Sequence, residues 1–185
     1  MIDDVKRRAN AKMEAAMEHL RKELSSIRTG RASLSILEGI KVDYYGTQMP
    51  LQQVATLAVP ESRLITIQPW ESKIIGEIEK AILSSEIGVT PTNDGKLIRL
   101  SIPPLTEERR KDLVKAVKKL GEDARISIRN LRRDANEELK RLHKEAALTD
   151  DQLRKTQEEV QKVTDQYIKR IDEVIAKKEE DILAV

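Results

Sequence analysis

Residues 106–147 have the sequence TEERRKDLVKAVKKLGEDARISIRNLRRDANEELKRLHKEAA, and the spacing of its apolar residues decides the fold. They recur every three or four positions, which places them on one face of a helix. This face consists of Leu113, Val117, Leu120, Ala124, Ile128, Leu131, Ala135, Leu139, Leu142 and Ala146. Thr106 is a favourable N-cap, and Glu107 and Glu108 suit the positive start of a helix. The segment therefore predicts one helix of roughly 60 Å, at 1.5 Å per residue.

Gly121 lies inside this predicted helix, where glycine costs about 1 kcal/mol relative to alanine. We expect the helix to continue through it. The glycine then marks either a close approach of a neighbouring helix or a mild bend.

Two further segments show the same helical spacing. The first contains Ile2, Val5, Ala9, Met13, Met17, Leu20, Leu24 and Ile27. The second begins with a capping box, Thr149 followed by Gln152, and continues through Leu153, Val160, Val163, Tyr167, Ile171 and Val174. Three amphipathic helices need one another to bury their apolar faces, so they predict an antiparallel three-helix bundle.

Proline and glycine divide the chain into two compositions. All six prolines and six of the seven glycines lie within residues 30–105. That segment contains 7 Lys/Arg and 8 Asp/Glu, whereas the rest of the chain contains 27 and 24. We therefore expect two domains: a bundle formed by residues 1–29 and 106–185, and an inserted domain formed by residues 30–105.

The inserted segment has the pattern of short strands and one helix. Ile40, Val42 and Tyr44 alternate with polar residues before a turn at Gly46–Thr47. Residues 64–67 and 97–102 predict two more strands, the latter after the turn signal Asn93–Asp94–Gly95. Ile74, Ile75, Ile78, Ala81 and Ile82 fit one helix. The insert is predicted to be a small α+β domain, so the fold class of the whole chain is α+β with two domains.

Two short segments join the domains. Thr29, Gly30 and Arg31 form one joint, and Pro103, Pro104 and Leu105 form the other. Glycine permits unusual backbone dihedrals and proline stiffens its strand. A fixed elbow and a functional hinge both fit this pattern.

A row of basic residues runs beside the apolar face of residues 106–147. At 100° per residue, Lys118, Arg125, Arg129, Arg132, Asn136 and Lys140 fall within about 80° of one another. Residues 118–133 contain six bases and two acids. A solvated face of i,i+4 ion pairs is one interpretation. The other is a contact with the backbone of folded RNA, since arginine suits bidentate phosphate binding and no aromatic residue is interleaved for base stacking.

The composition argues against several classes of protein. The chain has no cysteine, which removes disulfides, thiolate metal sites and cysteine nucleophiles. It has no phosphate-binding glycine loop, and its two histidines, His19 and His143, lie within predicted helices as surface residues. We expect no catalytic residue, no metal, no cofactor, no membrane span and a cytoplasmic location. Trp70, after Pro69, is predicted to pack at a helix start.

Three separated motifs resemble those of the bacterial ribosome recycling factor family. They are Arg28–Thr29–Gly30–Arg31–Ala32 at the first joint, residues 103–111 (PPLTEERRK) at the second, and residues 128–134 (IRNLRRD) in the long helix. The length and the insertion layout are also similar from end to end.

The resemblance implies an L-shaped, non-catalytic monomer that binds the 70S ribosome after termination. Elongation factor G, which hydrolyses GTP, then helps it to separate the subunits for reuse. In this family the bundle contacts RNA of the large subunit, which ranks Arg129 and Arg132 first, followed by Arg110 and Arg133. The helical wheel adds Arg125 and Lys118, and the first joint adds Arg28 and Arg31 as second-rank contacts. The resemblance also favours a hinge at the joints.

A coiled-coil scaffold or chaperone adaptor without RNA binding is the alternative from another class. Charged amphipathic helices fit such a protein equally well when the motifs are set aside. A scaffold should bind through apolar faces with little salt dependence, whereas RNA binding should weaken steeply with salt.

Overall fold

A computed structural model describes residues 1–184 of the chain, and these fall into two compact units. The first consists of Met1–Arg28 and Thr106–Ala184, and the second of Thr29–Leu105. The first unit contains the helices α1 (Ile2–Ser25), α3 (Glu107–Lys144) and α4 (Asp150–Leu183). The second contains α2 (Ile75–Ser84), β1 (Lys41–Tyr44), β2 (Thr47–Pro50), β3 (Ala55–Glu61), β4 (Leu64–Pro69), β5 (Thr92–Asn93), β6 (Ile98–Ser101) and the 3-10 turns Leu34–Leu37, Leu51–Gln53 and Ser72–Ile74.

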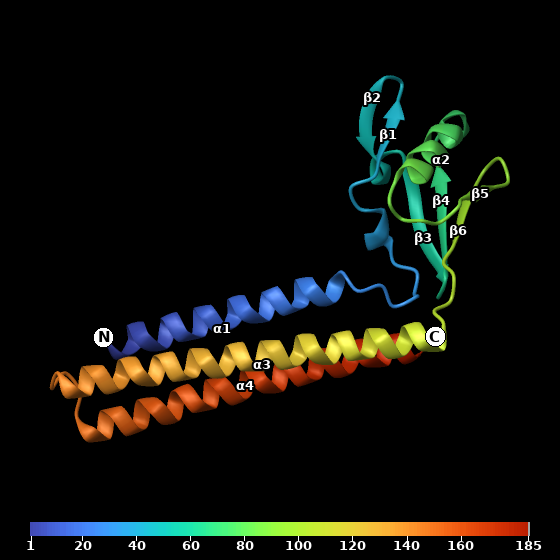
Figure 1. Cartoon of the computed structure of the whole chain (residues 1–185). Coiled ribbons are helices and arrows are strands. Elements are labelled where there is room, and N and C mark those ends of the chain that lie inside the picture. Colours follow the sequence, from blue (N-terminus) through green and yellow to red (C-terminus); the bar gives the residue numbers. More distant parts are fainter. Residues whose placement is uncertain (185) are drawn as a thin grey trace. The chain divides into compact units, whose positions relative to one another are not determined.

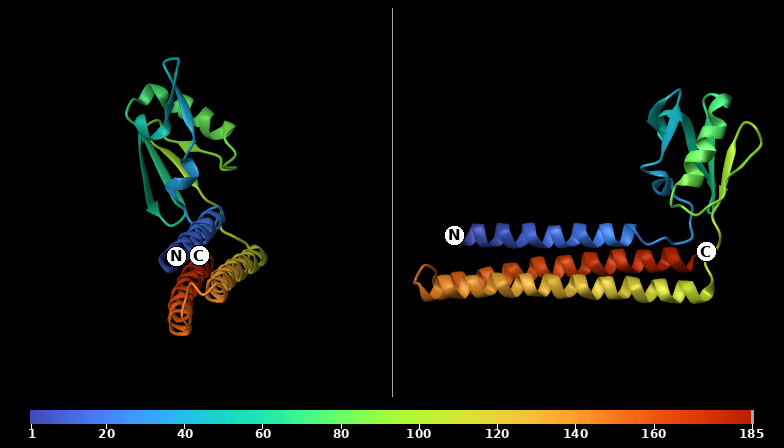
Figure 2. Two further views of the ribbon diagram at one scale, coloured as in Figure 1. Left: turned by 90° about the vertical axis from the view of Figure 1, so that its left-hand side faces the viewer. Right: turned by 45° about the horizontal axis from the view of Figure 1, so that its top comes forward.

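The first unit is a three-helix bundle in which α1, α3 and α4 lie side by side (Figures 1 and 2). The helix α3 runs antiparallel to both of its neighbours. Lys6 contacts Glu159 and Glu14 contacts Arg170, so residue numbers rise together and α1 and α4 run in the same direction. The predicted apolar faces form the core, where Met13, Met17, Ile128, Leu139 and Ile171 are fully buried. These faces pack because each helix alone would leave its apolar stripe in water.

The ends of α3 and α4 follow their caps. The Thr106 hydroxyl accepts a hydrogen bond from the Arg109 amide, and the capping box of Thr149 and Gln152 is formed as predicted. The helix α3 ends at Lys144, earlier than the predicted residue 147. Ala146 has φ +56, and the Ala147 amide donates to the Leu142 carbonyl, which is the hydrogen bond of a Schellman motif. Ala146 is therefore exposed beyond the helix and does not extend its apolar face.

The sequence pattern missed two buried threonines on α4. Thr156 and Thr164 are 4% and 2% exposed. Their hydroxyls donate to the carbonyls of Gln152 and Val160 four residues earlier, which satisfies the buried oxygens inside the helix. Polar residue types gave no signal that these positions belong to the core.

The second unit is a four-stranded antiparallel sheet in the order β3-β4-β6-β5, with α2 and the β1–β2 hairpin packed into one core. Alternate residues of the central strands, Ile65 and Ile67 of β4 and Ile98 and Leu100 of β6, are completely buried. Pro60 lies on the edge strand β3 beside a register shift, where the missing amide breaks no ladder. The predicted strands and helix are present, and β2, β3 and β5 are additional.

The prediction for Trp70 was wrong. Its side chain is 64% exposed, and its indole nitrogen donates to the Thr56 hydroxyl at 2.9 Å. Strand β4 continues to Pro69, and the helical segment begins with the 3-10 turn Ser72–Ile74. Trp70 follows the alternation of the strand and therefore lies on its solvent side instead of packing under the helix.

Both joints lie next to residues that are hydrogen-bonded to the β3–β4 turn of the second unit. Gly30 has φ +77, and a Cβ built on it would lie 3.0 Å from the Leu105 side chain. The Ala32 amide donates to the Ser62 carbonyl and the Ile102 amide to the Arg63 carbonyl. Both connections are thus tied to the β3–β4 turn just inside residues 29–31 and 103–105.

Candidate nucleic-acid interface

The surface of α3 that carries its predicted RNA contacts is called the basic face. It consists of Arg110, Lys118, Arg125, Arg129, Arg132 and Arg133. Arg110, Arg125 and Arg132 are half-buried, and the last two contact α4. Lys118, Arg129 and Arg133 are exposed. A single helix of 38 residues holds them all, and they span roughly 35 Å of its length at 1.5 Å per residue.

Arg125 has its charge matched inside the bundle. Its Nε donates to Asp172 Oδ1 at 2.8 Å, and its Nη1 lies 3.2 Å from Glu122 Oε2. Only 23% of its side chain is exposed. Partial burial opposes its charged form, but the bonds and charges of Asp172 and Glu122 raise the pKa of Arg125 overall. The side chain therefore acts as a tie between α3 and α4 and has less charge to offer a ligand than the helical wheel suggests.

Arg129, Arg132 and Arg133 are less compensated. Arg129 Nη1 lies 3.6 Å from Glu122 Oε1, a carboxylate that it shares with Arg125. Arg132 Nη1 donates to the neutral Oε1 of Gln161 at 3.4 Å. Within residues 1–184, neither Arg132 nor Arg133 forms an ion pair. Lys118 and Arg110 likewise form no ion pair among the described residues, so Arg132 and Arg133 are the adjacent pair among the uncompensated charges of the basic face.

Gln161 is positioned to leave Arg132 charged and oriented. Its Nε2 donates to Asp165 Oδ1 at 2.8 Å, which fixes the amide so that its oxygen faces Arg132. A neutral acceptor restricts the guanidinium without cancelling its charge. The other Arg132 nitrogens keep donors for a phosphate or carboxylate ligand.

Gly121 sets the distance between α3 and α4 beside this face. A Cβ built on it would lie 2.9 Å from Ile175 Cγ1 and 3.6 Å from Arg125 Nη1. The glycine thus marks a close helix approach, one of the two outcomes expected from the sequence, and α3 continues through it. The approach brings the carboxylate of Asp172 within reach of Arg125.

The remaining predicted contacts are Arg110, at the start of the basic face, and Arg28 and Arg31, which lie outside α3. Arg110 is half-buried in the first turn of α3, and its Nε is buried without a hydrogen-bond partner among residues 1–184. Arg28 is exposed in the first unit and Arg31 in the second. Arg31 therefore belongs to a different unit from the basic face, whereas Arg28 belongs to the same one.

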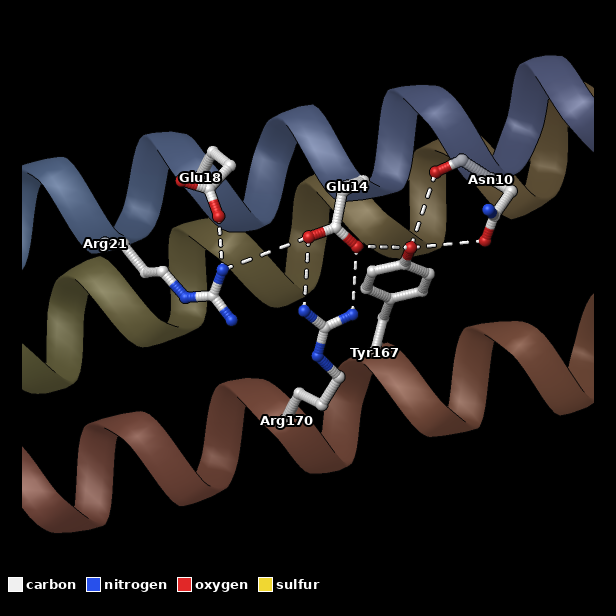
Figure 3. Close-up of polar contacts among 6 residues, drawn as sticks. All are labelled: Asn10, Glu14, Glu18, Arg21, Tyr167 and Arg170. Atoms are coloured by element: carbon white, nitrogen blue, oxygen red, sulfur yellow. Dashed lines mark hydrogen bonds and ion pairs between the residues drawn. The ribbon is translucent and has the colours of Figure 1, made fainter.

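A polar network between α1 and α4 was not foreseen from the sequence (Figure 3). Glu14 accepts hydrogen bonds from Arg170 Nη1 at 3.0 Å and Nη2 at 3.2 Å, and from the Tyr167 hydroxyl at 2.8 Å. The bonds from Arg170, and then that from Tyr167, lower the pKa of Glu14 to about 2. Spacing within one helix cannot reveal such a cluster, because its members come from helices about 150 residues apart.

The histidines and acidic residues form no metal site within the described part of the chain. Residues 1–184 contain no group of three or more His, Asp or Glu side chains that could hold a metal ion. His143 is 2.6 Å from Asp150, and His19, 75% exposed, pairs with Glu23 on its own helix. Among these residues, no helix is both long enough and apolar enough to cross a membrane.

The fold and the basic face define a class of protein: a long three-helix bundle that presents a row of cations, with a small α+β unit inserted after its first helix. Comparisons with known proteins agree with this class. Residues 20–183 match the family model described as ribosome recycling factor. The chain belongs to the ribosome recycling factor family, whose members are non-catalytic factors.

Named relatives cover nearly the whole chain. The ribosome-recycling factor of Desulfatibacillum aliphaticivorans is 54% identical over 183 residues, covering 99% of both chains. That of Trichlorobacter lovleyi is 58% identical over 175 residues, covering 95% of both. A solution structure of the ribosome recycling factor matches with TM-score 0.77 at 40% identity, covering 100% of this chain and 98% of that one.

A second solved structure concerns a complex with partners. It describes the T. thermophilus ribosome recycling factor and the E. coli elongation factor G bound to the E. coli post-termination complex. The match has TM-score 0.64 and 42% identity and covers 99% of each chain. These findings favour the ribosome-binding interpretation over the coiled-coil scaffold.

Proposed function

We propose that this chain binds the ribosome after termination and, together with elongation factor G, promotes its separation into subunits for reuse. GTP hydrolysis belongs to elongation factor G, and this chain supplies binding surfaces only. The family match over residues 20–183 supports this function. A relative of the same fold has been described on the post-termination complex beside elongation factor G. Because this activity acts on ribosomes, it supports a cytoplasmic location, which is part of the proposal.

The basic face of α3 is the proposed contact with RNA of the large subunit. The observation that carries this proposal is the uncompensated pair Arg132 and Arg133, beside an Arg129 that shares one carboxylate. Charge-assisted bonds from a guanidinium fork suit phosphate oxygens, and a rigid helix keeps the forks in register along an RNA backbone. Arg132 and Arg129 rank first, followed by Arg133.

The remaining predicted contacts take lower ranks. Lys118 and Arg110 would extend the contact toward the start of α3, as one exposed ammonium and one half-buried guanidinium. Arg28 and Arg31 remain second-rank contacts on their own units. Arg125 falls below them because Asp172 and Glu122 already neutralise it.

Residues 29–31 and 103–105 are the proposed hinge. The hydrogen bonds of Ala32 and Ile102 to the β3–β4 turn support this position, because they fix the chain immediately beyond each joint. Rotation is thereby confined to the short segments outside them. Gly30 contributes a backbone dihedral, φ +77, that other residues rarely adopt.

The test compares two single-charge deletions, Arg132→Ala and Arg7→Ala. Arg7 is on α1 with 78% of its side chain exposed, and its only ion pair among residues 1–184 is the local one with Asp4. Binding to purified large subunits is measured by sedimentation over a series of salt concentrations. Arg132→Ala should weaken binding roughly tenfold or more and lower the slope of log affinity against log salt by about 1.

Arg7→Ala should leave both the affinity and the slope within error of the unsubstituted protein. Circular dichroism of each variant verifies that the bundle is intact. Equal affinities for Arg132→Ala and the unsubstituted protein, with a folded bundle, would remove the basic face from the RNA contact. Equal losses in both variants would point to non-specific charge attraction instead.

A further inference from the structure

The second unit concentrates most of the chain's aromatic residues at one end. The chain has three tyrosines, one tryptophan and no phenylalanine. Tyr44 and Tyr45 lie at the β1–β2 turn and Trp70 lies just beyond the end of β4. Strand β4 starts opposite Ser101 of β6, next to the chain connections, so Trp70 lies at the far end of this unit. Two of these three side chains, Tyr45 and Trp70, are exposed, and scarce aromatic side chains left in water at one place call for an explanation.

Glu71 joins this end of β4 to the hairpin. Its Oε1 accepts a hydrogen bond from the Tyr44 hydroxyl at 2.6 Å, and its Oε2 accepts one from the Tyr45 hydroxyl at 2.7 Å. The two tyrosine rings meet edge to face, with centroids 4.7 Å apart. These hydrogen bonds, that of Tyr44 first, lower the pKa of Glu71, so its carboxylate is ionised at neutral pH.

Anchoring the hairpin explains Tyr44 but not Tyr45. Tyr44 packs against the core of the unit and already ties the hairpin to Glu71. Tyr45 is 68% exposed and has φ +49, a conformation that two-residue hairpin turns normally give to asparagine, aspartate or glycine. A bulky residue in this region is unusual, and such outliers gather at functional positions. The exposed ring of Tyr45 is therefore better explained by a ligand than by packing.

We propose that Tyr45 and Glu71 form a docking site for an arginine or lysine side chain on a basic segment of a partner protein. A carboxylate offers about four acceptor positions, and the two tyrosine hydroxyls occupy two of them. The other two are left for a guanidinium or ammonium group. The exposed ring of Tyr45 beside this carboxylate adds a cation–π contact for the same charge.

The charge of the site selects among partners. Nucleic acid is disfavoured as a partner, because the Glu71 carboxylate repels phosphate. Among residues 1–184, Lys73 is the one basic residue whose charge acts on Glu71, so the site has no basic cluster to offset this repulsion. A symmetric contact between two copies of this chain would place one Glu71 beside the other, which like charges oppose. This inference rests on the proposed function in one respect: the candidate partner proteins are those of the post-termination ribosome and elongation factor G.

The experiment places a photo-reactive benzoylphenylalanine at position 70, next to the site, and leaves Tyr45 and Glu71 intact. The protein is irradiated on purified post-termination ribosomes with elongation factor G, and cross-linked peptides are identified by mass spectrometry. Leu83, exposed to 62% on α2 of the same unit, receives the same group as a matched control. Position 70 should cross-link to a protein segment containing arginine or lysine, and position 83 should not label that segment.

Three substitutions in the position-70 protein separate docking from hairpin anchoring. Glu71→Gln removes the charge at constant size and should lower the cross-link yield about three- to fivefold, as should Tyr45→Gly, which removes the ring. Tyr45→Phe keeps the ring and should retain the yield within about twofold. Cross-linking to ribosomal RNA or to a second copy, or a yield unchanged by Glu71→Gln, would overturn the docking site.

Pelleting of the same samples with ribosomes separates this inference from the proposed function. Failure of the unsubstituted protein to pellet would count against the proposed function. Normal pelleting with no cross-link to a basic protein segment would count against the docking site alone.

Discussion

The helices α3 and α4 approach closely at Gly121. The effect of Gly121→Ala on the free energy of unfolding should therefore depend on the facing side chain of Ile175. Alanine in place of glycine inside a helix normally stabilises it by about 1 kcal/mol. Here the new methyl group would lie 2.9 Å from Ile175 Cγ1 and 3.1 Å from its Cδ1. Ile175 is 5% exposed and β-branched, so it cannot simply rotate away. Overpacking of a core costs about 1–3 kcal/mol, so Gly121→Ala should destabilise the bundle by up to about 2 kcal/mol.

Removing the obstructing side chain should reverse that sign. Ile175→Ala alone should cost about 2–5 kcal/mol, because it leaves a cavity. In the Ile175→Ala background, the methyl group added by Gly121→Ala enters that space. The higher helix propensity of alanine is then no longer offset by a clash. Gly121→Ala should then stabilise by about 1 kcal/mol. The free energy of unfolding of the four proteins, measured by urea titration of the helical circular dichroism signal, tests this reversal.

Gly76 in α2 is the matched control. A Cβ built on it meets nothing within 4 Å, so Gly76→Ala should be neutral or stabilising by no more than about 1 kcal/mol. If Gly121→Ala stabilised the unsubstituted protein as an open helix position does, the two helices would be free to separate there. The close packing that positions Asp172 against Arg125 would then not be rigid.

Two further predictions concern the bundle. Glu14 has its pKa lowered from 4.5 to about 2, so its interactions stabilise the fold fully above the unfolded value and lose this effect as pH falls from 4.5 toward 2. Glu14→Gln should flatten that part of a plot of urea midpoint against pH, and an unchanged plot would show that the network contributes nothing. Thr149→Ala removes the hydroxyl that accepts from the Gln152 amide at 3.2 Å and should cost about 1 kcal/mol in urea unfolding. An unaltered midpoint would mean that packing of the preceding loop, and not the cap, fixes the start of α4.

The sequence by itself determined the helices and most of their limits. Apolar spacing places a residue on a helix face whatever surrounds it, so the stripes that contain Met13, Ile128 and Ile171 were correct. Caps act over three or four residues, so Thr106 and Thr149 were found from local pattern alone. The family resemblance rested on motifs at residues 28–32, 103–111 and 128–134, and the family match confirms it.

Tertiary structure decided which charges on the basic face are available. On a helical wheel Arg125 and Arg132 are equivalent, but α4 presents a carboxylate to Arg125 and a neutral amide to Arg132. For the same reason, the sequence did not predict three other features: the Glu14 network, the burial of Thr156 and the exposure of Trp70. Each depends on what a second segment places opposite the residue, and electrostatic and burial energies are set by these distances rather than by spacing along one chain.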